Sequence, residues 1–326
     1  MNAASNMGAI DPRKEAANVS LDHEAVAFLS CGVTLRGIIV RPKGSRSLPA
    51  IVMAPGMSGV KEGSIMKFAE NFASIGFAVL AFDNANFGES EGAPRQEADP
   101  MIQRIGYRDA ITYLSLRNDI DCDRIGIFGT SYSGGHVLNV AAHDRRVKCV
   151  VSQIPAISGF EAFIRGVRAD QRDAFLETLN QDRKKRFSGE APAMIKSVSD
   201  VATDLCIMPG KPAYEYFMKQ AAIAPNWRNE VTLRSIDLWI GTDNAVFAQW
   251  ISPTPLLMIV ALQDELAPPD LALDAFSRAR EPKKLVTIPG NHFSPYSEHF
   301  LHVSKEAREW FSHHLLTEEA GAAGAQ

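Results

Sequence analysis

One serine in the sequence lies where a hydroxyl group can become reactive. Ser131 falls in the stretch "IGIFGTSYSGGH", residues 125–136, between strand-forming aliphatic residues and residues that can begin a helix. Small flanking residues let a sharp turn approach its neighbours, and the following helix offers unpaired N–H groups and its positive dipole end to an anion. A strand, a tight turn with serine and a helix together predict a nucleophile elbow with Ser131 as the nucleophile.

The elbow has one departure from the usual pattern and one alternative interpretation. Its fifth residue is usually glycine, and here it is Ser133, which is small and precedes Gly134 and Gly135. The alternative is a serine in a glycine-rich loop that only caps a helix. The strand before Ser131 and the helix after it favour the nucleophile.

A serine nucleophile needs a base and an acid that orients the base, and both follow in the chain order Ser, Asp, His. Asp264 comes shortly after the predicted strand "LLMIVA", and His292 comes just after "KLVTIP". We predict that His292 is the general base and then the general acid. Asp264 would fix the imidazole tautomer and stabilise its charged form. Glu265 is the alternative acid, although the shorter arm of aspartate suits the loop.

The oxyanion formed during attack on a carbonyl needs two preorganised donors. The backbone N–H of Tyr132, directly after the nucleophile, is the first candidate. The second is the backbone N–H of Met57, in the loop "PGMSGVKEG" (55–63) that follows a predicted strand. The alternative for this loop is a glycine-rich connection without a catalytic role.

Two further histidines, His299 and His302, lie one helical turn apart. This spacing could suit metal ligands, but the pattern places no third ligand. We therefore expect a solvated helix face there, and neither a metal nor a cofactor in this protein.

Strands and helices that alternate along the chain must position these residues. Two β-rich runs, 25–32 and 33–42, predict an antiparallel pair. The alternation that follows predicts a mostly parallel sheet covered by helices on both faces, an α/β fold. The predicted strands are residues 50–56, 77–83, 124–129, 147–154, 255–261 and 284–289, and the predicted helices are 64–76, 101–117, the segment after Ser131, 269–280 and about 297–316.

The alternation lapses between residues 156 and 250, which are mostly helical in pattern and rich in aromatic residues. We predict an inserted helical cap over this range, on a discontinuous core of residues 1–155 and 251–326 with flexible tails at both ends. Aromatic residues under such a cap would suit an apolar acyl or aromatic substrate. The basic run "QDRKKRF" (181–187) is expected on a solvated helix face.

Composition excludes several classes of partner. The net charge is −4 without a block of basic residues, which argues against a nucleic acid or an anionic membrane. No apolar run is long enough to span a membrane, and the start of the sequence lacks a signal-peptide pattern, so we expect a cytoplasmic protein. Four scattered cysteines predict reduced structural thiols. The oligomeric state is left open, a homodimer included.

These motifs together resemble the α/β-hydrolase superfamily over almost the whole chain. The resemblance depends on "PGMSG", on "FDNANFGESEG" (82–92), on "DCDRIGIFGTSYSGG" and on the contexts of Asp264 and His292. Asn86 lies in the region where that family often has arginine. The elbow run is most similar to the dienelactone-hydrolase and peptidase S15-like branch, and the whole arrangement also resembles the polyketide transferase and thiohydrolase subgroup.

The resemblance and the predicted site imply a serine hydrolase that cleaves a carboxylic ester or thioester of a small, apolar acyl or aromatic substrate through an acyl-enzyme. One alternative is an acyltransferase that hands the same acyl group to an alcohol or amine. Another is a carbon–carbon bond hydrolase of a diketone. A binding protein without activity would be expected to lack part of the triad, and here Ser131, Asp264 and His292 are all present.

Overall fold

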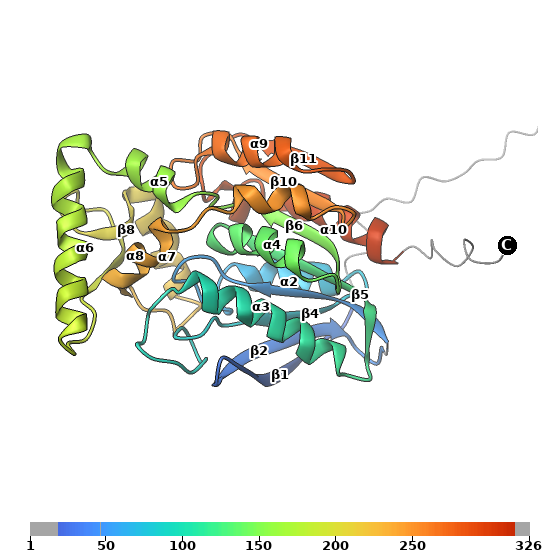
Figure 1. Cartoon of the computed structure of the whole chain (residues 1–326). Coiled ribbons are helices and arrows are strands. Elements are labelled where there is room, and N and C mark those ends of the chain that lie inside the picture. The colour runs from blue at the N-terminus through green and yellow to red at the C-terminus, as the bar shows by residue number, and fades with distance from the viewer. Residues whose placement is uncertain (1–18, 46, 317–326) are drawn as a thin grey trace, which may run out of the picture.

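A twisted sheet of eight strands forms the centre of the molecule (Figure 1). The computed structural model describes residues 19–45 and 47–316. The strand order is β1-β2-β4-β3-β5-β6-β10-β11; β1 pairs antiparallel with β2, β2 pairs antiparallel with β4, and the other neighbours are parallel. The bounds are β1 (Leu21–Ser30), β2 (Val33–Pro42), β3 (Leu48–Ala54), β4 (Ala78–Phe82), β5 (Ile120–Thr130), β6 (Val147–Gln153), β10 (Leu256–Ala261) and β11 (Lys283–Ile288).

Helices cover both faces of the sheet and bury its aliphatic side chains in two cores. The two-residue period of a strand sends alternate residues to opposite faces. In β3, Ala50 and Val52 join the core on one face, whereas Ile51 and Met53 join the core on the other. The first core lies under α3 (Pro100–Ser115), α4 (Tyr132–His143) and α9 (Pro269–Arg278); the second lies under α2 (Ile65–Ala73) and α10 (Phe300–Phe311).

The predicted fold class and order of elements are confirmed, with differences at some ends. Strand β5 begins at Ile120, four residues before the predicted start. The predicted last helix, about 297–316, begins later than predicted, at Phe300, and ends in a π-helical turn (Ser312–Leu316); a short 3-10 turn (Ser294–Tyr296) precedes it. The backbone of Ser297, with φ −126° and ψ −104°, cannot be part of a helix, which explains the later start. Most of both predicted tails lies outside the described residues.

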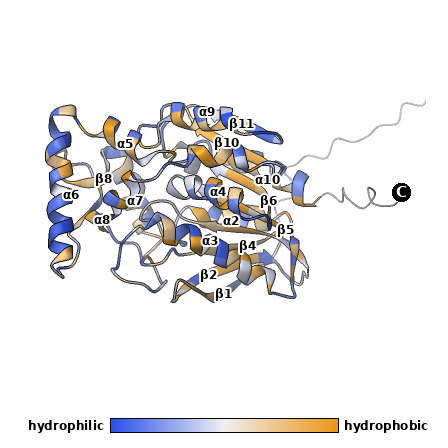
Figure 2. Ribbon diagram, viewed as in Figure 1, coloured by the Kyte–Doolittle hydropathy of each residue, from blue (hydrophilic) through white to orange (hydrophobic). Residues whose placement is uncertain are grey.

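The segment predicted as a helical cap also contains a small sheet. Its helices are α5 (Gly159–Gly166), α6 (Arg172–Phe187), α7 (Lys211–Ala221) and α8 (Leu233–Ile240), and its strands are β7 (Met194–Ser199), β8 (Cys206–Pro209) and β9 (Val231–Thr232), in the order β8-β7-β9. These elements lie together at one end of the central sheet (Figure 1). Helix α6 is hydrophilic along most of its length (Figure 2), as expected for the basic run that it contains.

The end of the predicted cap segment packs on the core. Ala245 and Ala248 lie in the short helical turn Ala245–Trp250 and are buried in the core cluster with residues of α4 and α9. This turn therefore joins the two parts of the molecule, while α5 to α8 stand over the end of the sheet. The domain boundaries at residues 156 and 250, between the core and the cap, stay a prediction.

The cysteines form no disulfide within the described residues. The four cysteines are all free. Cys149 lies inside β6, where burial raises the pKa of its thiol well above the usual value, so it stays protonated. Among the helices of the described residues, none is long and apolar enough to cross a membrane.

Candidate active site

Ser131 lies on the turn between β5 and α4 in a conformation that side chains seldom adopt. Its backbone has φ +59° and ψ −121°, a strained geometry for a residue with a Cβ. The turn is closely packed: a Cβ built on Gly129 would lie 2.2 Å from the Ser133 carbonyl oxygen, so glycine is required there. The predicted strand, turn and helix are therefore present, with Ser131 at the apex.

Ser133 takes the position where the elbow usually has glycine, and its hydrogen bonds explain why serine fits. Its Oγ accepts a hydrogen bond from the N–H of Thr130 at 2.9 Å. The hydroxyl can donate to the carbonyl oxygen of Ala54 or of Thr130, each also at 2.9 Å. Ser133 is fully buried, so these bonds satisfy a group that would otherwise be costly there.

His292 and Asp264 meet Ser131 at the carboxyl edge of the sheet. Strands β10 and β11 are parallel neighbours, so the loops after them lie side by side. His292 Nε2 is 2.8 Å from Ser131 Oγ, and His292 Nδ1 is 2.6 Å from Asp264 Oδ2. With the imidazole proton on Nδ1, the ring donates to the carboxylate and accepts from the serine hydroxyl. The three residues have the geometry of a nucleophile, a base and an orienting acid.

The loop after β10 holds the Asp264 carboxylate inside the protein and leaves the next residue, Glu265, exposed to solvent. Asp264 Oδ1 accepts hydrogen bonds from the N–H groups of Leu266 at 2.9 Å and Ala267 at 2.8 Å. Asp264 is buried, whereas Glu265 is exposed. The geometry thus places Asp264, and not the alternative Glu265, against the imidazole.

The other histidines near the site do not take part in this arrangement. His136 is buried in α4, where its Nε2 lies 3.1 Å from Gln103 Oε1, and burial lowers its pKa well below the usual value. A neutral, enclosed imidazole of this kind is structural. His302 is exposed on α10 and His299 is half-buried at the start of that helix.

Two backbone N–H groups lie beside Ser131. Tyr132 is the first residue of α4, so its N–H has no partner within the helix. Gly56 packs against the nucleophile: a Cβ built on it would approach the Ser131 Cβ to 3.1 Å. The next residue, Met57, lines the same cavity as Ser131 and Tyr132. The assignment of the Met57 and Tyr132 N–H groups to an oxyanion hole stays a prediction, and this arrangement agrees with it.

A buried lysine anchors the loop that carries Met57. The Lys61 side chain is 1% exposed, and its Nζ lies 2.6 Å from Glu62 Oε1, 2.9 Å from Asp83 Oδ2 and 2.6 Å from Glu89 Oε2. The Lys61 N–H also donates to Asp83 Oδ1 at 2.7 Å. Burial lowers the pKa of Lys61, but the three carboxylates outweigh it, so the net pKa is raised and the ammonium stays charged. This contact could not be predicted from the sequence, because only the fold brings Lys61 and Asp83 together.

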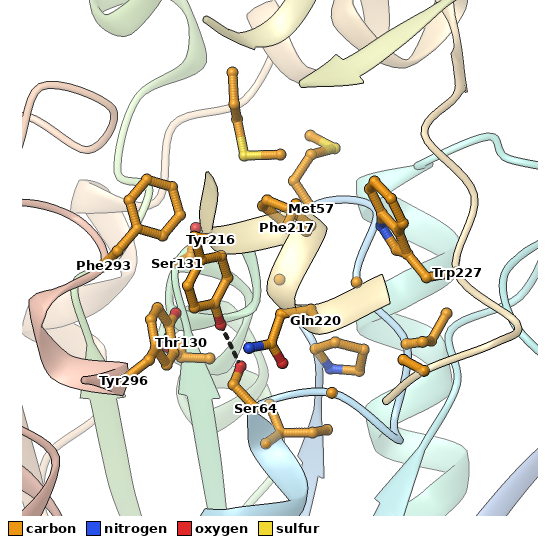
Figure 3. Close-up of a pocket in the computed structure, with 18 of the residues that line it drawn as sticks. Met57, Ser64, Thr130, Ser131, Tyr216, Phe217, Gln220, Trp227, Phe293 and Tyr296 are labelled. Atoms are coloured by element: carbon orange, nitrogen blue, oxygen red, sulfur yellow. Dashed lines mark hydrogen bonds between the residues drawn. The ribbon is translucent and has the colours of Figure 1, made fainter. Parts of the chain in front are cut away.

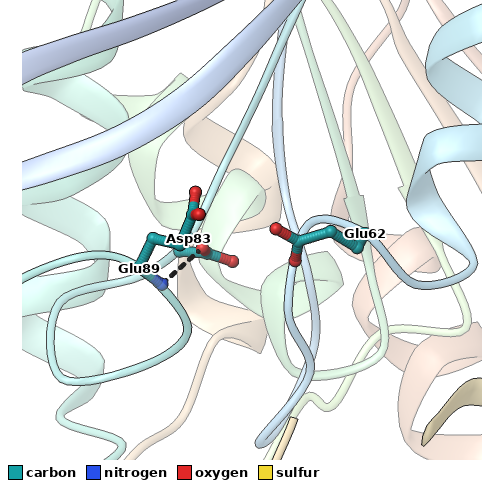
Figure 4. A group of neighbouring side chains, drawn as sticks. All are labelled: Glu62, Asp83 and Glu89. Carbon is teal, nitrogen blue, oxygen red and sulfur yellow. Dashed lines mark hydrogen bonds between the residues drawn. The ribbon is translucent and has the colours of Figure 1, made fainter. Parts of the chain in front are cut away.

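The same carboxylates are the one group of possible metal ligands found within the described residues. Oxygens of Glu62, Asp83 and Glu89 lie within 4.8 Å of one another (Figure 4). Because Lys61 Nζ is hydrogen-bonded to all three, the ammonium is the cation that this cluster holds. Asp83 belongs to the segment "FDNANFGESEG" (82–92), and its positive partner comes from the Met57 loop.

Replacing Lys61 with methionine is expected to destabilise the protein by about 3 kcal/mol, because it leaves a buried carboxylate without its counter-ion. Half-exposed Glu89 is screened by water and contributes little to this value. Chemical denaturation would measure the change. Lys67→Met, on the exposed face of α2, is the matched control and should stay within about 0.5 kcal/mol of the parent. Equal stability of the two variants would contradict the anchoring role.

Two cavities adjoin Ser131, and both are mainly apolar. The first, which we call the cap cavity, encloses about 560 Å³ together with its mouth (Figure 3). Its principal wall residues are Met57, Met208, Tyr216, Phe217, Phe293 and Tyr296. The second, which we call the inner cavity, encloses about 390 Å³ with its mouth, between Tyr132, Ile207, Trp239 and Leu266. Their apolar walls fit a substrate with apolar groups.

A third and more polar chamber also borders His292. Gln263, Glu265 and Asn291 line it, together with Leu266 and Phe293. We call it the outer chamber. His292 borders this chamber as well as both apolar cavities.

Comparisons with known proteins agree with this geometry. Residues 49–299 match the sequence profile of the family described as alpha/beta hydrolase fold. A thiohydrolase, aneE, of Aspergillus aculeatus is 33% identical over 82% of this chain and 85% of its own. The polyketide transferase claH of Penicillium crustosum is 29% identical over 84% of this chain and 91% of its own. The solved structure of DcsB in complex with its substrate analogue is similar at a TM-score of 0.79, with 26% identity, covering 91% of this chain and all of that one.

Proposed function

The chain belongs to the α/β-hydrolase fold family, and from that premise we propose that it is a serine hydrolase that cleaves a carboxylic ester or thioester through an acyl-enzyme intermediate. The observation that carries the proposal is the continuous hydrogen-bond chain from Ser131 Oγ through His292 to Asp264, at 2.8 and 2.6 Å. The apolar cavities beside Ser131 favour an apolar acyl or aromatic group in the substrate.

In the proposed reaction, Ser131 Oγ attacks the carbonyl carbon while His292 Nε2 takes the hydroxyl proton. The negative charge that forms on the carbonyl oxygen would be met by the N–H groups of Met57 and Tyr132. The protonated imidazole, stabilised by Asp264, then gives its proton to the departing alcohol or thiol. His292 next takes a proton from water, whose attack on the acyl-enzyme releases the acid and restores the serine.

Acyl transfer is the second candidate, because one relative is named a polyketide transferase. The same acyl-enzyme would form, and an alcohol or amine would attack it in place of water. This outcome requires the acceptor to reach the acyl group more readily than water does, which the apolar walls of both cavities would assist.

The proposal is tested by intact-mass analysis after exposure to a fluorophosphonate probe, with one covalent adduct expected on Ser131. A panel of acyl thioesters and p-nitrophenyl esters of increasing chain length should then show turnover that rises with apolar chain length. Adding an alcohol or amine separates the two candidates, since a transferase gives the acyl-acceptor product and a hydrolase gives the free acid. An unlabelled protein that turns over no member of the panel would contradict both.

A further inference from the structure

The cap cavity contains two polar atoms that no protein group satisfies. They are the amide oxygen of Gln220, on α7, and the indole N–H of Trp227, in the segment between α7 and β9. Both atoms are shielded from solvent, and neither has a hydrogen-bond partner among the described residues. In Figure 3, Trp227 lies across the cavity from Phe293, with the amide of Gln220 between them.

The two tyrosine hydroxyls of this cavity are paired. The hydroxyl of Tyr216 donates to Ser64 Oγ at 2.6 Å, and the hydroxyl of Tyr296 lies 2.6 Å from Thr130 Oγ1. Burial raises the pKa of both phenols, so they stay neutral and keep these bonds. The Gln220 amide oxygen, an acceptor, and the Trp227 indole N–H, a donor, thus stay without a partner in a cavity whose other walls are mainly apolar.

A hydroxyl group is the smallest ligand group that satisfies both atoms, because it donates one hydrogen bond and accepts others. A ketone could pair only with the indole N–H of Trp227, and an alkyl chain with neither atom. No group of the described residues pairs with these two atoms, so a ligand group that reaches them would satisfy both. The amide of Gln220 can turn about its side-chain bonds to meet it.

We propose that the cap cavity selects an acyl group that carries a hydroxyl, with Gln220 accepting from that hydroxyl and Trp227 donating to it. This inference rests on the proposed function, because it assumes that an acyl group is attached to Ser131. The leaving group is assigned to the space that His292 borders outside the cap cavity, namely the inner cavity and the outer chamber, because His292 must protonate it. The acyl group then remains on the side of the Met57 loop and the cap, where the two polar atoms lie.

The experiment compares kcat/KM for matched pairs of acyl thioesters that differ only by one hydroxyl, moved along the chain. One series carries an aliphatic alcohol and a second carries a phenol on an aromatic acyl group. We expect a preference of about 10- to 100-fold for a hydroxylated member at the position that reaches Gln220 and Trp227, because its deoxy partner leaves both atoms unpaired. The series that shows the preference identifies the kind of hydroxyl.

The variant Gln220→Met removes the side-chain amide, Trp227→Phe removes the indole N–H, and both keep most of the side-chain volume. Phenylalanine at 227 keeps an aromatic ring beside Phe217, which stacks on Trp227 at a centroid distance of 5.4 Å. The hydroxyl preference should fall about three- to tenfold in each variant and vanish in the double variant. Lys219→Met, at an exposed position of α7, is the matched control and should keep the preference.

No preference at any hydroxyl position, or a preference that the double variant retains, would overturn the inference. A preference for a hydroxyl on the leaving group in place of the acyl group would overturn it too. Failure of the proposed function is distinguishable, because it would abolish fluorophosphonate labelling and turnover of the deoxy thioesters as well.

Discussion

Ser131→Ala is expected to abolish fluorophosphonate labelling and to lower kcat by about 10⁶, the order found when a triad serine is removed from a serine protease. The reason is that Oγ is the only atom of the Ser131 side chain that can form the acyl-enzyme. The fold should be unchanged, because alanine keeps the Cβ that the strained turn already accommodates at φ +59°. Intact-mass analysis measures the labelling, a thioester assay measures kcat, and a thermal melt verifies the fold.

Ser133→Gly is the matched control for this experiment. It restores the glycine that the elbow usually has at this position, two residues after the nucleophile. It removes the Ser133 hydroxyl, which is hydrogen-bonded to Thr130 and Ala54. This variant should still be labelled. His292→Ala should cost nearly as much activity as Ser131→Ala, and the double variant should be no worse, since the members of a triad act as a unit. A labelled Ser131→Ala protein would assign the nucleophile to another residue.

The central sheet and the elbow could be predicted because their signals are local. A strand in a parallel sheet covered on both faces is a short aliphatic run, and a helix on that sheet repeats its apolar residues with a helical period, so β3 to β6 and the helices between them were found in order. The elbow is equally local, since the strand, Ser131 and the helix N-terminus lie within a dozen residues. The loop positions of His292 and Asp264 followed from the strands before them.

The contacts that were missed join segments far apart in the sequence. The two-residue strand β9 pairs with β7, more than thirty residues earlier, and a strand so short has no period to detect. In the sequence, nothing distinguishes Lys61 from a surface lysine. Only the fold brings Asp83 and Glu89 to its ammonium group. Gln220 and Trp227 are likewise ordinary cap residues in the sequence, and only the cavity between the cap and the Met57 loop gives them a common role.

Asp264→Asn is expected to lower kcat by about 10⁴, the loss seen for the same change in a serine protease triad. An amide at this position can donate to Nδ1, which favours the imidazole tautomer that has its proton on Nε2 and cannot accept the proton of Ser131. The N–H groups of Leu266 and Ala267 bond to Oδ1, so the asparagine oxygen can keep those two bonds and leave its NH₂ toward His292. Steady-state kinetics with one thioester, on a variant with an unchanged melting temperature, measures the loss.

Glu265→Gln is the matched change one residue later, and it should be nearly silent, because Glu265 is exposed and lines the outer chamber instead of contacting the imidazole. If Glu265→Gln were inactive and Asp264→Asn active, the orienting acid would be Glu265, and the rest of the mechanism would be unchanged. If both variants were active, the acid would have to come from another strand. That result would contradict the 2.6 Å contact between His292 and Asp264, which depends on the parallel pairing of β10 with β11. The pair of substitutions therefore tests the chemistry of the site and the packing that builds it in one measurement.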